Sequence, residues 1–522
     1  MGCCHRYTIL HRALLFLSLC SIASITITTD AFDVRHHLST VTRYDVSKEI
    51  SAGDAHISID PPNKCSVIHL NLVARHGTRA PTKKRIRELD RLAIRLNSLV
   101  SHVEVEAHGI ITSPEKYPAW LSSWQSPWKG RDKGGELITL GEEELYLLGN
   151  RIRERFPELF NVEYHPDIFP IKATQVPRAS ASAVAFGLGL FSGKGSLGHG
   201  RHRAFSVVTE SRASDIWLRF YDTCQTYKDY RITQEPAVEK LKEPILTEVS
   251  SALTSRYSLN FTMSDVASLW FLCKQATSLL DITDQACALF NQTEVLLLEW
   301  TDDLEMFILK GYGKSINYRM GLPLLRDVLQ SMEKAVFARE SQSTGTFEKA
   351  QLRFAHAETV VPFTCLLGLF LERSEFEKIQ SEQPFQLPPK PPLERSWRGS
   401  IVAPFAGNNM LALYHCPADK SKSSAPEKHN GSYFVQVFHN EIPVKLPGCG
   451  DVDLCPFEVF KEKVVSPHLR HNFESICNVK SVTTNSCSSP CKLLRAASNI
   501  YRWIFPAEQK DEARIGGHKG EL

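Results

Sequence analysis

Stretches in which apolar and polar residues alternate recur along the chain, and several precede a stretch with helical spacing. Residues 65–73 alternate and contain β-branched side chains, which predicts a strand, whereas the charged, leucine-rich residues 83–100 predict a helix. A short strand at 169–174 before an alanine-rich helix, and a strand at 351–355 before another helix, repeat this arrangement. The succession of elements predicts an α/β fold.

The remaining pattern divides the chain into parts. Helical signals dominate residues 213–344, which we interpret as a mostly α-helical insert. Residues 32–60 are polar and irregular, which predicts a loose leader. The expected parts are a signal peptide at 1–31, an α/β core at 62–212 and 345–491, the insert at 213–344, and a C-terminal helix with a mobile tail at 492–522.

The N-terminus has the features of a secretory signal. Arg6 and Arg12 precede an apolar run over residues 13–28, and small residues follow up to a candidate cleavage site at Ala31. An uncleaved signal anchor is the alternative, although the run is short for a bilayer span. We expect a protein of the secretory pathway, in the extracellular space, a vacuole or the lumen of the endoplasmic reticulum, with no membrane insertion after cleavage.

Composition narrows the class of function. The 522 residues include 61 Lys and Arg against 58 Asp and Glu, a net charge of +3 that is too balanced for a dedicated nucleic-acid binder. Hydrophobic residues make up 43% and charged residues 23% of the chain, which is typical of globular proteins. We expect a monomer that acts on a small molecule.

The cysteines fit an exported protein. Eleven follow the signal region, which predicts a disulfide framework with one thiol left over. Cys487 and Cys491 are expected to pair by proximity. Glycosylation sequons occur at Asn260, Asn291 and Asn430.

The candidate chemistry begins where the first predicted strand ends. Residues 75–82 read Arg-His-Gly-Thr-Arg-Ala-Pro-Thr, so that Arg75 and Arg79 flank His76. Guanidinium groups match phosphate oxygens, and a neutral imidazole between them can attack phosphorus. The alternative is a basic surface turn that caps a helix. The carboxyl end of a strand is where open α/β sheets bind ligands, which favours the first interpretation.

The chain resembles the histidine acid phosphatase superfamily and, more narrowly, the multiple inositol polyphosphate phosphatases. Three stretches carry the resemblance: residues 75–82, residues 178–180 with the downstream 220–224, and His356-Ala-Glu358. The resemblance covers residues 65–491. It implies a phosphoglycerate mutase-like fold, with a mixed sheet flanked by helices and a mostly α-helical cap domain, and a reaction without a cofactor or a metal.

The resemblance also implies roles for individual residues. His76 is the expected nucleophile and Glu358 the general acid, while Arg75, Arg79, Arg178 and His356 surround the phosphate. Further expected substrate contacts come from Thr82, Lys83, Lys84 and Arg203. The implied disulfides are Cys65–Cys416, Cys224–Cys477, Cys273–Cys287 and Cys449–Cys455, with Cys365 free. Taken alone, Arg178 and Glu358 would equally suit a helix start, and His356 a buried core position.

These observations predict a phosphomonoesterase that removes phosphates from inositol polyphosphates such as phytate through a phosphohistidine. One alternative is a phosphatase that acts on 2,3-bisphosphoglycerate, or a general acid phosphatase. Another is a catalytically dead fold that binds anions, against which the complete set of catalytic side chains argues.

Overall fold

The computed structural model describes residues 32–53, 65–107, 116–341, 347–371, 378, 386–392, 394–417 and 432–479. The chain divides into a large unit, Met1–Asn478, and a short one, Val479–Leu522, of which Val479 is described. All elements below belong to the large unit. The predicted signal peptide, the C-terminal helix, Asn430 and the pair Cys487–Cys491 lie outside the described residues.

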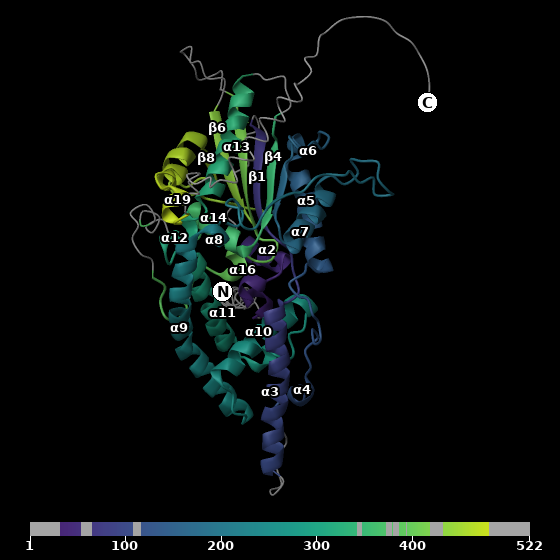
Figure 1. Ribbon diagram of the computed structural model, residues 1–522, viewed down its shortest axis with the longest axis vertical. Coiled ribbons are helices and arrows are strands. Elements are labelled where there is room, and N and C mark those ends of the chain that lie inside the picture. Colours follow the sequence, from purple (N-terminus) through teal and green to yellow (C-terminus); the bar gives the residue numbers. More distant parts are fainter. Residues whose placement is uncertain are drawn as a thin grey trace, which may run out of the picture. The chain divides into compact units, whose positions relative to one another are not determined.

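An eight-stranded mixed sheet organises the large unit (Figure 1). In spatial order its strands are β3 (Val208–Glu210), β2 (Ile171–Thr174), β4 (Ala350–Ala355), β1 (Ser66–Arg75), β5 (Asn408–Cys416), β6 (Ser432–His439) and β7 (Ile442–Val444), with β8 (Leu454–Pro456) also paired to β6. The first four strands are parallel and the others antiparallel. The carboxyl ends of β1, β2 and β4 therefore meet at one edge.

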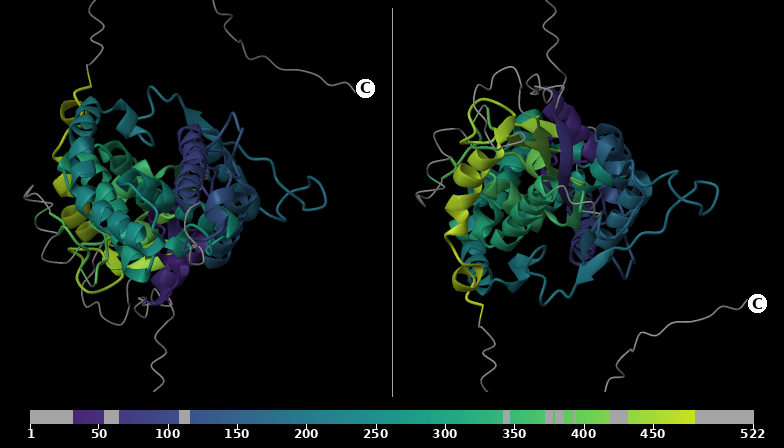
Figure 2. Two further views of the ribbon diagram at one scale, coloured as in Figure 1. Left: turned by 90° about the horizontal axis from the view of Figure 1, so that it is seen from below. Right: turned by 90° about the horizontal axis from the view of Figure 1, so that it is seen from above.

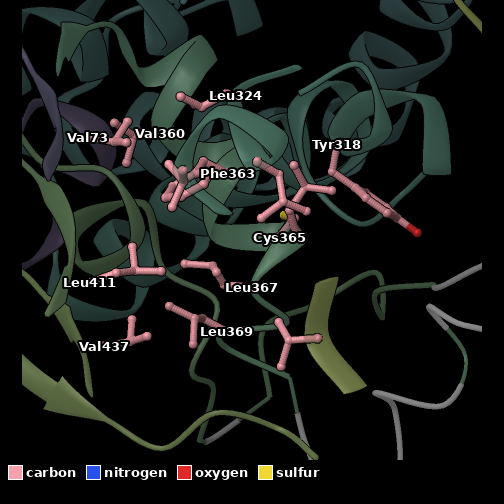
Figure 3. Packing of buried hydrophobic residues seen from close by; sticks show 14 of the residues in the cluster. Val73, Tyr318, Leu324, Val360, Phe363, Cys365, Leu367, Leu369, Leu411 and Val437 are labelled. Atoms are coloured by element: carbon pink, nitrogen blue, oxygen red, sulfur yellow. The ribbon is translucent and has the colours of Figure 1, made fainter. Parts of the chain in front are cut away.

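Helices cover both faces of the sheet, which is why β1 is almost entirely buried. Leu70, Leu72 and Ala74 of β1 face a core shared with α5 (Thr139–Arg155), α6 (Pro157–Phe160) and α7 (Pro177–Leu190). Val73 points to the opposite core, which α13 (Leu322–Glu340) and α14 (Ala357–Leu366) complete (Figure 3). This period of two follows from the pleat of the strand.

The segment predicted to be a helical insert is helical in the structure. It contains α8 (Phe220–Thr223), α9 (Gln225–Tyr257), α10 (Met263–Leu280), α11 (Gln292–Lys310), α12 (Ser315–Arg319) and α13. Helices α9, α10 and α11 share an apolar core with the long α3 (Lys83–Ala107). This helix follows the loop that begins where β1 ends. Figure 1 shows this helical group next to the edge at which β1 ends.

The expectation of a loose leader over residues 32–60 was wrong for residues 32–53, and residues 54–60 lie outside the described residues. Residues 34–37 and 39–41 form short 3₁₀ turns, and α2 (Tyr44–Gly53) follows them. His37 Nδ1 lies 2.9 Å from the buried carboxylate of Glu299, and Thr42 accepts a backbone hydrogen bond from Phe405 at 3.0 Å. The polar side chain of His37 partners a buried charge on α11, so the polar composition of the segment gave no sign of packing.

Four disulfides join Cys65 to Cys416, Cys224 to Cys477, Cys273 to Cys287 and Cys449 to Cys455, the pairs that the resemblance implied. Cys365 is a buried free thiol. Disulfides of this number are typical of an oxidising compartment. Within the described ranges, no helix combines the length and the apolar character that a bilayer span requires.

Candidate active site

The loop after β1 is fixed by hydrogen bonds from three directions. The backbone N–H of His76 donates to Ala355 on β4 at 3.0 Å, and the N–H of Gly77 donates to Ser182 Oγ on α7 at 3.1 Å. Thr78 donates through its N–H and its hydroxyl to the two carboxylate oxygens of Glu144, at 2.7 and 2.8 Å. The loop is therefore rigid before any ligand binds.

Gly77 allows the loop to pass close to α5. A Cβ atom at this position would lie 2.2 Å from the carbonyl oxygen of Gly141 and would collide with that backbone. The close approach brings Thr78 to Glu144 and sets the direction of the neighbouring imidazole.

The His76 side chain is buried and held in one tautomer. Its Nδ1–H donates to the carbonyl oxygen of Gly77 at 2.9 Å, so Nε2 carries the free lone pair. Burial, followed by the charges of Arg75 and its neighbours, holds the pKa of His76 well below its ordinary value. A neutral imidazole with a free Nε2 is the form that can act as a nucleophile.

Guanidinium groups surround this imidazole. Arg75 donates to the carbonyl oxygens of Thr40 and Ala403, and its guanidinium lies 4.4 Å from the centre of the Phe405 ring. The Nε atoms of Arg75, Arg79, Arg178 and Arg219 are buried and have no hydrogen-bond partner among the described residues. Four cations with unused donors form an environment suited to phosphate oxygens.

Burial lowers the pKa of Arg75 to about 9 and that of Arg79 to about 10. Both groups still carry their charge at neutral and acidic pH, because these values remain above neutrality. The mutual repulsion of the arginines adds to the same shift, and an anion bound among them would relieve it.

His356 closes the other side of the cluster. Its ring lies edge-on to His76, with 5.4 Å between the ring centres. Arg178 Nη2 lies 3.3 Å from Nδ1, and Nε2 lies 2.9 Å from the hydroxyl of Thr174 and 3.3 Å from Arg219 Nη1. Burial and the charge of Arg178 lower the pKa of His356 to about 3, so its ring is neutral.

Glu358 lies in the first turn of α14, two residues beyond His356. Its Oε1 accepts a hydrogen bond from Lys310 Nζ, 3.0 Å away, at the last residue of α11. Although burial opposes this, the charge of Lys310 and its hydrogen bond hold the pKa of Glu358 well below its ordinary value. In the ligand-free protein Glu358 is therefore ionised.

A cavity of about 280 Å³ adjoins the arginine cluster and shares Arg79 with it. The catalytic loop contributes Arg79 and Thr82, and the helical insert contributes Lys274 and Lys310. The other lining residues are Leu38, Ser39, Thr40, Val41, Pro81, Arg85, Phe271, Gln275, Asp302, Glu305, Met306, Ala357 and Val361. The cavity thus offers several cations to an anionic molecule.

Three predicted substrate residues do not line this cavity. Lys83 and Lys84 are exposed on the first turn of α3, where the helical rotation turns Thr82 and Arg85 toward the cavity instead. Arg203 lies on the exposed glycine-rich loop, which Figures 1 and 2 show projecting from the body of the unit, and its nearest acidic partner is Glu163 at 3.7 Å.

Two predicted glycosylation sites are exposed in the structure. Asn260 lies between α9 and α10. Asn291 precedes α11 and accepts the N–H of Glu294 through its side-chain oxygen at 2.9 Å. Within the described residues, no group of three or more His, Cys, Asp and Glu side chains is arranged as a metal site.

Sequence reasoning missed Arg219, Lys310 and the hydroxyl of Thr174. Arg219 directly precedes the matched stretch 220–224, and Thr174 ends a predicted strand. Arg219 could have been found by extending the matched stretch by one residue, and Thr174 by inspecting the last residue of the predicted strand 169–174. Lys310 had no such signal, because it belongs to the helical insert.

Comparison with known proteins identifies relatives over most of the chain. Residues 66–440 match the histidine phosphatase superfamily (branch 2). Multiple inositol polyphosphate phosphatase 1 of Dictyostelium discoideum is 26% identical over 479 residues, covering 82% of this chain and 71% of the relative. The Homo sapiens protein of the same name is 26% identical, covering 88% and 90%. The crystal structure of the phytase from D. castellii superposes with a TM-score of 0.63 at 16% identity, covering 90% and 96%.

Proposed function

The chain belongs to the histidine phosphatase superfamily (branch 2), and we propose that it is a phosphomonoesterase that removes phosphates from inositol polyphosphates such as phytate. The observation that carries this proposal is the neutral His76, whose Nε2 carries a free lone pair and whose ring is subject to the charges of Arg75, Arg178 and Arg79. The phosphatases of D. discoideum and H. sapiens named above support the substrate class.

In the first step, His76 Nε2 attacks phosphorus and the bond to the ester oxygen breaks. Arg75, Arg79 and Arg178 stabilise the charge that gathers on the equatorial oxygens of the transferring group. The leaving oxygen keeps the electron pair of the broken bond and takes a proton from Glu358. An inositol alkoxide is a poor leaving group, so this proton matters.

In the second step, water attacks the phosphorus of phospho-His76. Glu358, which is now ionised, accepts a proton from this water, and the N–P bond breaks with its electrons returning to Nε2. Inorganic phosphate leaves, Glu358 again holds the proton that it gave in the first step, and His76 is again neutral. The two steps together therefore consume one water molecule and need no further reactant.

The proposal includes a site of action in the secretory pathway. The four disulfides and the signal-like N-terminus support it, and the extracellular space, a vacuole and the lumen of the endoplasmic reticulum all satisfy it. We propose a monomeric enzyme, which sedimentation of the purified protein would test.

Release of inorganic phosphate from phytate near pH 5 tests the function, with His76→Ala as the control. Turnover by the wild-type protein and its loss in the variant are expected. Preferred turnover of 2,3-bisphosphoglycerate would favour the alternative phosphatase, and absence of turnover on every phosphate ester would indicate an anion-binding protein.

A further inference from the structure

Lys310 lies between the carboxylate of Glu358 and the cavity. Its ammonium group holds Glu358 at 3.0 Å, and the same residue lines the cavity beside Arg79. It is the last residue of α11, so a long and flexible side chain extends from a helix end. The cation can therefore turn either to the carboxylate or to an anion in the cavity.

The pairing with Lys310 conflicts with the role of Glu358. A general acid must carry a proton before the leaving group departs, whereas an ammonium group at this distance favours the ionised carboxylate. The enzyme thus needs something that separates the two side chains during the first step.

We propose that Lys310 makes the supply of the proton from Glu358 depend on a second phosphate of the substrate. This inference rests on the proposed function. A phosphate in the cavity, with its two negative charges, competes with one carboxylate for Lys310. Once Lys310 has turned to that phosphate, Glu358 loses its cation and gains an anion nearby, and both changes favour its protonation. The site would then favour substrates with a second phosphate through the rate of the first step as well as through binding.

Other charged and titratable groups also face Glu358. They come from the catalytic loop, α7, α8, α9 and the end of β4, and they are Arg75, Arg79, Arg178, Tyr221, Tyr227, Arg231 and His356. The arginines of the catalytic cluster meet the transferring phosphate, which every substrate has. Lys310 is the cation that lines the cavity and also bonds Glu358, so its position depends on the rest of the substrate.

The test compares three esters in the wild-type protein, Lys310→Gln and Lys310→Met. Phytate and glycerol 2-phosphate both release an alkoxide, but the latter has no second phosphate. A nitrophenyl phosphate releases nitrophenolate, which needs little protonation. The burst of nitrophenolate in the first turnover therefore shows whether His76 and the arginines are assembled in each variant. Rapid-quench measurement of the first turnover, from pH 3 to pH 7, isolates phosphoryl transfer to His76.

With glycerol 2-phosphate, the rate of the first step falls as the pH rises and Glu358 loses its proton. In Lys310→Gln and Lys310→Met this fall should occur at a pH about one unit higher, which corresponds to about a tenfold larger protonated fraction of Glu358 above its pKa. With phytate the fall should move much less, because its second phosphate already engages Lys310. Lys310→Arg should retain the wild-type profile. Lys274→Gln is the matched control, since Lys274 lines the same cavity but pairs with Asp302, and it should weaken phytate binding without moving either profile.

An unchanged profile for glycerol 2-phosphate in both neutral variants would overturn the inference, as would equal shifts for the two alkyl esters. Either result would leave the proposed function intact, because phytate would still be hydrolysed through His76. A wild-type protein that hydrolyses neither alkyl ester would instead contradict the proposed function, and the inference with it.

Discussion

The Nδ1–H of His76 donates to the carbonyl oxygen of Gly77, the next residue in the chain, over 2.9 Å. This contact forces the reactive Nε2 to be the unprotonated nitrogen. Gly77 cannot carry a side chain because of Gly141, so the turn that makes the contact is also the turn that lets the loop reach α5. One glycine therefore serves both the tautomer and the position of the nucleophile.

Replacing His76 by alanine should abolish phosphoenzyme formation and phytate hydrolysis. The fold should survive, since the loop is held by Glu144 and Ser182 rather than by the imidazole. Acid-quenched labelling with a radioactive phosphate ester measures the intermediate, and circular dichroism checks the fold. Substantial hydrolysis by a folded His76→Ala protein would remove this residue from the nucleophilic role.

Replacing Glu358 by glutamine should slow the first step on phytate by about 100-fold or more, the usual range for general acid catalysis. The same step on a nitrophenyl phosphate should suffer much less, because nitrophenolate leaves largely without a proton. Burst kinetics are required, since water attack on phospho-His76 also uses Glu358. Equal losses on both esters would show that the proton comes from another group.

Replacing Arg219 by glutamine should lower kcat/KM by about 100-fold, as expected for the loss of one fixed donor to a transition state. Arg219 lies 3.3 Å from His356, and its Nε has no partner among the described residues. Arg326→Gln on the exposed side of α13 is the matched control and should change little. A similar kcat/KM for Arg219→Gln and the wild-type protein would exclude Arg219 from the site.

Lowering the pH from 6.5 to 4 should destabilise the ligand-free protein. Burial lowers the pKa of His356 to about 3 and those of His439 and His468 to about 4. In this window the unfolded chain binds protons that the folded chain does not, so the free energy of unfolding falls as the pH falls. Asp303, Glu144 and Asp215 work in the opposite direction, because burial raises the pKa of each, that of Asp303 to about 7.

Scanning calorimetry at pH 6.5, 5 and 4 measures this balance. Burial also lowers the pKa of His69 and His76, so five histidines oppose three carboxyl groups and Tm should fall. Added inorganic phosphate should raise Tm at each pH by binding the arginine cluster. A Tm that rises toward pH 4 without phosphate would show that the carboxyl groups outweigh the histidines.

Removing the disulfide Cys65–Cys416 by a double alanine substitution should lower the free energy of unfolding by roughly 2–5 kcal/mol. This bond spans 351 residues, whereas Cys449–Cys455 spans six. Because a longer closed loop restricts the unfolded chain more, the first substitution should be the costlier. Chemical denaturation of the two variants compares them, and the reverse order would contradict the argument.

Local sequence patterns were sufficient to predict the strands whose ends hold the candidate catalytic residues. Strand β1 was predicted from its alternation, and β4 and β2 as short strands before a helix, each within a few residues of its observed bounds. The resemblance was sufficient for the family and for the cysteine pairs. His76 could be named in advance because two arginines flank it at the end of a predicted strand, whereas His356 was named through the resemblance.

Contacts between distant segments were beyond prediction. Thr40 accepts from Arg75 and Lys310 bonds Glu358, but neither residue has a local pattern that distinguishes it from an ordinary loop threonine or helix-end lysine. Lys83 and Lys84 are exposed on the first turn of α3 and do not line the cavity, whereas Thr82 and Arg85 do, so a contact of the two lysines with the substrate stays a prediction. Helical phase and tertiary packing decide such cases.

The position of β1 in the sheet has a consequence for synthesis of the protein. This strand carries the nucleophile and lies near the start of the chain, yet its two neighbours in the sheet are β4 and β5, more than 270 residues later. Until the ribosome has made those strands, β1 has two open edges and His76 has no partner histidine. The site therefore cannot be complete in a short nascent chain, and both edges of its first strand stay unpaired for most of translation.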